Sequence, residues 1–298
     1  MKKTITLICF AFMAVCLTNA QEMVRSIKTN DWELILKKDM TYFIEPFGDK
    51  VTVKDYDYLQ FITLPETLIF TSKEPQEPEG VLINGVRWAT RNLASHGKFV
   101  EKPEDYGALF QWGRKGDGHE QRTSPNYPTN NYSEENGVVS GAGLDANGQI
   151  VSTHAAYGKF IKQDETPYDW RSPQINTLWN SGNETTPVKT ANDPCPAGWR
   201  LPTQAELQSL INAGSKWGES NGVSGRYFGT VPNQIFLPAA GGRDHATGGV
   251  LHSGEYGFYW SSAVTGIYAR YLGFYDGIVR VYGGNRAIGF SVRCVSDQ

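Results

Sequence analysis

Residues 195–206 read Cys-Pro-Ala-Gly-Trp-Arg-Leu-Pro-Thr-Gln-Ala-Glu, and this stretch leads into the one clear helix of the chain. Thr203 and Glu206 form a capping box, in which the threonine oxygen accepts a backbone N–H and the glutamate reaches back to the cap. Gly214 supplies a stop signal, so the sequence predicts a short helix that begins after Thr203. Apolar residues recur at helical spacing within it, at Leu207, Leu210 and Ile211.

The cysteines predict one structural disulfide. Cys9 and Cys16 lie in an N-terminal segment that we expect to be removed, which leaves Cys195 and Cys294. Two cysteines in an oxidising compartment most simply form one bond, and closing a loop of about 100 residues contributes roughly 4.7 kcal/mol in chain-entropy treatments. No Cys-x-x-Cys motif or histidine-rich cluster accompanies either cysteine, so we expect no metal site and no cofactor.

Residues 1–20 have the layout of a secretory signal peptide. A basic start precedes an apolar run from Thr4 to Leu17, and Ala20 offers a small residue for cleavage. The run is short for a bilayer span, which needs about 20 residues. A retained anchor helix and a lipoprotein modified at Cys16 are the alternatives. We expect an exported protein that is secreted or held at the cell surface, with the periplasm as a further compartment.

The exported chain is mildly acidic. Loss of Lys2 and Lys3 from the 28 basic residues leaves 26 against 31 acidic residues, a net charge of −5. This balance argues against nucleic-acid binding through a general basic surface. No second apolar run of membrane length follows the first, so we expect no membrane span after signal removal. The sequence does not define an oligomeric state.

The remaining chain divides into two parts joined by a linker. Residues 21–72 are a small β-rich segment, which is marginal as an independent core. Residues 73–80 are charged and proline-rich, without apolar periodicity, as is typical of a linker. Residues 81–298 are expected to form one domain, and abundant glycine, tryptophan and tyrosine favour short strands with many turns.

Two turn signals predict hairpins. One is Phe47-Gly48-Asp49, between two β-prone runs. The other is Asn84-Gly85, which separates two short apolar runs and is a strong hairpin signal. Further strands are expected at residues 58–64, 67–70, 107–113 and 234–238.

Several blocks of the C-terminal part occur in the order found in a known family. On these blocks, residues 80–298 resemble the Fibrobacter succinogenes major paralogous domain, whereas residues 21–79 are not covered. The blocks are 84–93 (NGVRWATRNL), 110–115 (FQWGRK), 192–203 (NDPCPAGWRLPT), 235–241 (IFLPAAG), 259–262 (YWSS) and 289–295 (GFSVRCV).

The resemblance implies a protein of the kind that gut and environmental Bacteroidetes export. It also implies a fold similar to the C-type-lectin-like fold of formylglycine-generating enzymes and of the variable proteins of diversity-generating retroelements. We therefore predict an α+β domain with short twisted antiparallel strands, one or two helices and long loops, preceded by the small β-rich segment. The Cys195–Cys294 bond would then join the start of the helix to the last strand.

Enzymatic activity is not expected. The formylglycine-generating relatives use a close pair of cysteines in the C-terminal region, where this chain has only Cys294. The five histidines fit no metal-ligand spacing. Asp244 and His245 with Ser261 are a conceivable hydrolytic set, but no nucleophile-elbow motif supports it.

The stretch from Ala263 to Ile288 favours a binding surface. Leu272 and Phe274 alternate with tyrosine and glycine, as in a half-buried strand. Tyrosine and arginine among small residues are typical of paratopes, because they give contact area at low entropic cost. The alternative is that the tyrosines are ordinary residues of a sheet face. The predicted ligand-binding residues are Tyr268, Tyr271, Gly273, Tyr275, Asp276, Arg280 and Tyr282.

We therefore expect an exported, adhesin-like or receptor-like protein that binds a protein or carbohydrate outside the cell. Residues 261–293 contain no Lys, Glu, Gln, Met or Trp, which adenine-directed mutagenesis of Asn codons ending in a pyrimidine cannot produce. The segment would then be one member of a repertoire diversified by a retroelement, although ordinary members of the resembled family have similar endings. A structural or adhesive subunit that docks through residues 21–72 is the alternative function.

Overall fold

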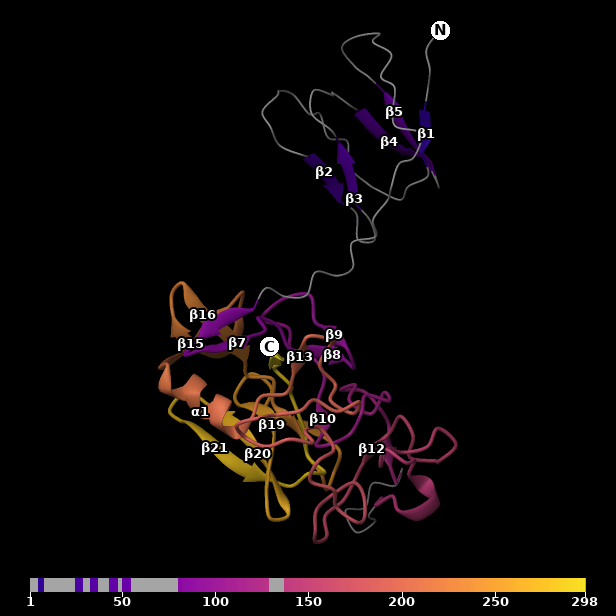
Figure 1. Ribbon diagram of the computed structural model, residues 1–298, viewed down its shortest axis with the longest axis vertical. Helices are drawn as coiled ribbons and strands as arrows, with labels where there is room; N and C mark the ends of the chain where they lie inside the picture. The colour runs from indigo at the N-terminus through magenta and orange to yellow at the C-terminus, as the bar shows by residue number, and fades with distance from the viewer. Residues whose placement is uncertain are drawn as a thin grey trace. The chain divides into compact units, whose positions relative to one another are not determined.

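The computed structural model describes residues 80–128 and 137–297, together with the backbone of five N-terminal strands (Figure 1). The chain divides into two compact units, Met1–Gln76 and Glu77–Gln298. This division falls inside the predicted linker, residues 73–80. Apart from those strands, the predicted signal peptide, the linker before Gly80 and the strands expected at 58–64 and 67–70 lie outside the described residues.

The N-terminal unit contains two small antiparallel sheets. β4 and β5 pair with Phe47 opposite Lys50, so the hairpin predicted around residues 47–49 is confirmed. β1 lies within the span predicted as a signal peptide and pairs with β5, while β2 pairs with β3. The strands are β1 (Ile5–Leu7), β2 (Arg25–Lys28), β3 (Glu33–Leu36), β4 (Phe43–Phe47) and β5 (Lys50–Lys54).

Two four-stranded sheets of the C-terminal unit bring the two ends of the unit together. In the first, the order is β13-β23-β7-β6, so the last strand lies between an early strand and the strand before the helix. In the second, the order is β10-β22-β17-β18. The strands of the first sheet are β6 (Val81–Ile83), β7 (Val86–Trp88), β13 (Trp199–Arg200) and β23 (Val295–Ser296). Those of the second are β10 (Phe110–Gln111), β17 (Gly242–Arg243), β18 (Val250–Leu251) and β22 (Gly289–Phe290).

Two three-stranded antiparallel sheets supply the longest strands. They are β14-β15-β16 and β19-β20-β21, each formed by consecutive hairpins. The first contains β14 (Ser215–Ser220), β15 (Val223–Thr230) and β16 (Asn233–Pro238), and the second contains β19 (Gly257–Thr265), β20 (Tyr268–Phe274) and β21 (Val279–Gly284). Smaller elements complete the unit: β8 (Leu93–Ser95) with β9 (Lys98–Phe99), β11 (Asn126–Tyr127) parallel to β12 (Phe160–Ile161), and a 3-10 turn, η1 (Gly141–Gly143).

The local turn and strand signals are largely confirmed. Asn84 and Gly85 connect β6 to β7 with φ of 47° and 82°, and positive φ at both turn residues is what a type I′ hairpin requires. The strand expected at 234–238 is β16. The strand expected at 107–113 is only β10, because Gly107 and Gly113 both have positive φ and end the extended backbone on either side.

The predicted helix is confirmed as α1 (Gln204–Asn212). The Thr203 side chain accepts the backbone N–H of Glu206, and the Glu206 carboxylate accepts that of Thr203 at 2.8 Å. Arg200 holds the same carboxylate with two hydrogen bonds, at 2.7 and 2.8 Å. Gly214 follows the helix with φ of 81°. The helix therefore begins and ends where its caps require.

The predicted α+β class is wrong, and with it the expectation of a C-type-lectin-like domain that combines short strands with one or two helices and long loops. The described residues form mostly small antiparallel sheets, and α1 is the single α-helix among them. The physical reason is that apolar residues at helical spacing occur in one short stretch. Sixteen glycines with positive φ interrupt the described residues, which favours hairpins and turns.

The β19-β20-β21 sheet lies between two hydrophobic cores. Tyr259 and Leu272 project from one face into a core that includes Leu207 and Leu210 of α1. Trp260 and Ala269 project from the other face into a core of aromatic side chains. Figure 1 shows α1 beside β20 and β21, on the side of the unit away from β12. Each face of the sheet therefore packs against a hydrophobic core along part of its length.

The predicted disulfide is present. Cys195 and Cys294, 99 residues apart, are bonded, and both are buried. The bond joins the segment before α1 to the segment before β23, and the Cys294 carbonyl also accepts the backbone N–H of Ala89 at 2.9 Å. Within the described residues, no helix is long and apolar enough to cross a membrane.

Replacing both cysteines, Cys195→Ser with Cys294→Ser, should lower the free energy of unfolding by about 2–5 kcal/mol, because the unfolded chain regains the freedom of a long loop. Urea unfolding followed by tryptophan fluorescence measures the change. Dithiothreitol should destabilise the wild type by a similar amount and leave the double variant unaffected. Equal transition midpoints for the wild type and the double variant would contradict this role.

Candidate functional site: an aromatic strip on the C-terminal sheet

The strand register brings several of the predicted ligand-binding residues onto one sheet face. Tyr271 of β20 lies opposite Tyr282 of β21, and Gly273 lies opposite Arg280. Residues directly opposite each other in an antiparallel pair project to the same side. These four residues therefore share one face, and Phe258 of β19, which is opposite Gly273, belongs to it as well.

Five aromatic rings follow one another along this face and past its edge. Ring centroids are 5.7 Å apart for Tyr282 and Tyr271, 6.0 Å for Tyr271 and Phe258, 5.8 Å for Phe258 and Tyr256, and 5.3 Å for Tyr256 and Tyr275. Each spacing lies in the range of favourable aromatic pairs. We call these five residues, Tyr256, Phe258, Tyr271, Tyr275 and Tyr282, the aromatic strip.

The two ends of the aromatic strip are open to solvent. Tyr275 is 36% exposed and Tyr282 is 37% exposed, whereas the three rings between them are half-buried. Burial and the neighbouring Tyr282 raise the pKa of Tyr271, so its hydroxyl stays protonated at neutral pH. The strip therefore offers neutral rings and hydroxyl groups, with the exposed Arg280 beside Tyr282 as its charged group.

Close packing from below fixes the rings. The Phe290 ring lies 4.8 Å from that of Phe258 and 4.7 Å from that of Tyr271. Two glycines leave room for the tyrosine rings: a Cβ at Gly284 would come within 2.9 Å of the Tyr271 ring, and a Cβ at Gly273 within 2.9 Å of the Tyr282 ring. Gly273, predicted as a contact residue, is buried and makes room for the rings.

Two of the predicted residues lie elsewhere. Tyr268 is 41% exposed, but its position in β20 places it on the opposite sheet face from Tyr271. Asp276 is exposed in the β20–β21 turn, and its backbone carbonyl, with that of Tyr275, accepts hydrogen bonds from Arg226. The structure thus gathers Tyr271, Gly273, Tyr275, Arg280 and Tyr282, and separates Tyr268 from them.

Sequence reasoning missed Tyr256 and Phe258, because the stretch chosen for the surface began at Ala263. The alternation along β19 supplies only part of the signal. Phe258 and Trp260 are two residues apart and so share a face. Counting back by twos from Tyr271 reaches Tyr259, so only the strand register, which pairs Phe258 with Gly273, places Phe258 on the same face as Tyr271.

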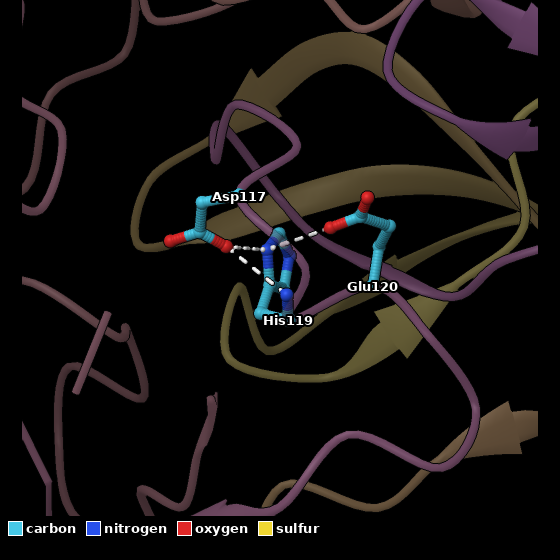
Figure 2. Close-up of side chains that lie close together, drawn as sticks. All are labelled: Asp117, His119 and Glu120. Carbon is cyan, nitrogen blue, oxygen red and sulfur yellow. Dashed lines mark hydrogen bonds and ion pairs between the residues drawn. The ribbon is translucent and has the colours of Figure 1, made fainter. Parts of the chain in front are cut away.

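A second group of chemically capable side chains lies around His119 (Figure 2). Its Nδ1 atom lies 2.7 Å from a carboxylate oxygen of Asp117 and 3.4 Å from one of Glu120. These are ligand types that a metal ion uses, and one atom from each lies within 4.8 Å of the others.

Hydrogen bonds within the protein already occupy these atoms. The other ring nitrogen of His119, Nε2, accepts the backbone N–H of Gln111 at 3.1 Å, so the proton lies on Nδ1 and points at Asp117. Glu120 accepts the backbone N–H of Gly118, and the buried Arg114 binds Asp117 at 2.7 Å. Arg114 supplies the positive charge that a cation would bring, so the arrangement is accounted for as a buried ion-pair network.

The residues considered as a hydrolytic set have separate partners. The Ser261 hydroxyl donates to the carbonyl of Arg270 and is buried. The Asp244 carboxylate accepts hydrogen bonds from the backbone of its own turn, at Ala246 and Thr247. His245 instead contacts the Gln163 carbonyl and the Asn285 side chain. The hydrogen bonds of Ser261, Asp244 and His245 therefore go to separate neighbours and do not connect the three side chains.

Comparisons of the chain with models of protein families, with curated proteins and with solved structures find no match in any of the three. The resemblance to the paralogous domain family therefore stays a prediction.

The buried network around His119 predicts loss of stability in acid. Burial, with Arg114 nearby, lowers the pKa of His119 below 6.5. Burial alone would raise the pKa of Asp117, but Arg114 and His119 hold it well below its usual range. Both folded-state values lie below the unfolded ones. The stabilisation from His119 is therefore present above about pH 6.5 and is lost as the pH falls below it, and that from Asp117 is lost below about pH 4.

Urea unfolding at intervals from pH 7.5 to 4.5 tests this prediction. His119→Gln should reduce the dependence of stability on pH in this window, where one proton contributes at most about 1.4 kcal/mol per pH unit. His252→Gln is the control, since that side chain is 53% exposed. The assignment to His119 fails if the His119→Gln profile runs parallel to that of the wild type.

Proposed function

We propose that this chain is an exported ligand-binding protein whose contact surface is the aromatic strip together with Arg280. One observation carries the proposal: five rings in successive contact, exposed at both ends, lie beside a guanidinium. Export follows from the expected signal peptide, and the partner is a protein or carbohydrate outside the cell.

The physics of recognition favours such a surface. Tyrosine buries a large area on binding and has few rotatable bonds, so it contributes contact at low entropic cost. The rings are already held against Phe290 and against each other, which reduces the ordering that a ligand would have to impose. The hydroxyl groups and Arg280 add directional hydrogen bonds, which give a ligand a defined orientation.

The alternative is that the tyrosines only stabilise strands. Aromatic residues do favour strands, and cross-strand pairs such as Tyr271–Tyr282 stabilise sheets. However, Tyr275 and Tyr256 lie outside the paired strands and still continue the series. A series that extends beyond the sheet is better explained by a surface that contacts a ligand.

The diversification hypothesis also stays a proposal. Tyr275, Asp276, Arg280 and Tyr282 are exposed on the β20–β21 hairpin, so their side chains could change with little effect on the buried network. A retroelement origin predicts a near-identical template repeat beside a reverse-transcriptase gene, differing from this gene only at adenines. Sequencing the locus measures this directly, and a locus that lacks both would exclude the hypothesis.

Replacing the exposed ends of the strip should weaken binding. A glycan and protein array probed with the wild type identifies binders, and Tyr275→Ala with Tyr282→Ala should weaken them at least tenfold, because two contact rings are removed. Tyr268→Ala is the matched control, because that tyrosine is equally exposed but lies on the opposite face. Equal binding by the double variant and the wild type, or a matching loss with Tyr268→Ala, would place the site elsewhere.

A further inference from the structure

β21 has one free edge beside the aromatic strip. It is the outer strand of the β19-β20-β21 sheet, and Figure 1 shows it at the periphery of the C-terminal unit. Among the described residues, every backbone hydrogen bond of Val279–Gly284 is made with β20. A row of backbone donors and acceptors on the far side is therefore left to solvent.

The ladder identifies which groups these are. The Tyr275 N–H donates to the Ile278 carbonyl at 3.0 Å, so these residues form a hydrogen-bonded pair at the turn. Hydrogen-bonded and non-bonded pairs alternate along an antiparallel ladder. Arg280 and Tyr282 are then bonded to β20. The backbone groups of the intervening residues, Val279, Val281 and Gly283, point away from the sheet.

The free edge is regular and carries a single charged side chain, Arg280. Pairing with β20 is continuous from Val279 to Gly284, without a bulge, and the strand contains no proline or lysine. Proteins usually protect an exposed edge with such features. β14, an outer strand of the neighbouring three-stranded sheet, carries Lys216 and Glu219, both exposed. β21 is therefore the more open of these two edges to an added strand.

The charge of the hairpin indicates which kind of peptide would bind at the free edge of β21. Residues 257–284 contain two arginines, Arg270 and Arg280, and one acidic residue, Asp276, although the chain as a whole is acidic. Arg280 projects on the same side as the aromatic strip. A residue placed directly opposite Arg280 on an added strand would lie within reach of its guanidinium, and an acidic side chain there would form an ion pair.

We propose that the edge of β21 binds an extended acidic peptide as a fourth strand. Its backbone pairs with Val279, Val281 and Gly283, an acidic side chain meets Arg280, and a side chain two residues away lies over Tyr282. This inference rests on the proposed function, because the aromatic strip supplies the side-chain contacts. An oligosaccharide lacks the regular amide array that the edge would satisfy, and a second copy would bring its own arginines to the same edge.

A pair of substitutions at Gly283 tests the edge. Gly283→Pro removes the outward N–H, whereas Gly283→Ala adds a Cβ and keeps that N–H. The new Cβ would make ordinary van der Waals contacts, with the Tyr268 Cβ at 3.4 Å as its nearest neighbour. Because the lost N–H takes no part in pairing with β20, proline is tolerated at such an edge position. Circular dichroism and thermal unfolding verify that both variants fold.

The probe is a phage-displayed library of random 12-residue peptides, selected on the purified protein, with the most enriched peptide then synthesised. The expected consensus has an acidic residue and, two positions away, an aromatic or β-branched one. The dissociation constant should be at least tenfold higher for Gly283→Pro than for Gly283→Ala, and Arg280→Glu should also weaken binding at least tenfold. In the wild type, the peptide should slow amide exchange at Val279, Val281 and Gly283.

Each other result overturns the proposal in a recognisable way. A peptide that binds both Gly283 variants equally but loses affinity with Tyr275→Ala and Tyr282→Ala would leave the aromatic strip as the site and exclude strand addition. Binding only to glycans on the array would be consistent with the proposed function but would exclude a peptide as the ligand of the β21 edge. A dimer that dissociates in Gly283→Pro alone would assign the edge to a second copy. No binding of any probe would count against both proposals.

Discussion

The buried guanidinium of Arg293 is the interaction on which the arrangement of the C-terminal unit depends. It donates two hydrogen bonds to the side chain of Asn92, 201 residues away, and one each to the carbonyls of Ala89 and Phe236. Burial lowers its pKa to about 10, so it remains charged at neutral pH. A buried charge is tolerated only with such a set of acceptors, so these three segments must converge.

The same segment supports the aromatic strip. Ser291 exchanges backbone hydrogen bonds with Phe258 and Trp260 of β19, while Phe290 lies beneath the rings of Phe258 and Tyr271. The disulfide at Cys294 and the pairing of Val295 with Trp88 hold the following residues. The position of the surface rings is therefore set by the segment from β22 to β23, in which backbone pairing, side-chain hydrogen bonds and the disulfide hold most residues.

The features that sequence reasoning predicted are those with local causes. The capping box at Thr203, the Asn84-Gly85 turn and the two available cysteines each determine their structure within a few residues or by elimination. The fold class was wrong because the resemblance implied an α+β domain, whereas one nine-residue helix is a small part of a unit built mostly from short antiparallel sheets. To predict which sheet face each tyrosine occupies, one must also know how neighbouring strands are aligned with one another. β19 has a register irregularity between Trp260 and Val264, which no local pattern in the sequence reveals.

The geometry also limits how far the surface can vary. Tyr275, Arg280 and Tyr282 project into solvent, so other side chains can replace them without touching the Arg293 network. Tyr271 is different, because Gly284 and Phe290 are fitted around its ring. A ligand surface on this hairpin would therefore change at its exposed ends and keep its centre. Recognition would combine a constant aromatic base and a constant backbone edge with side chains that can differ.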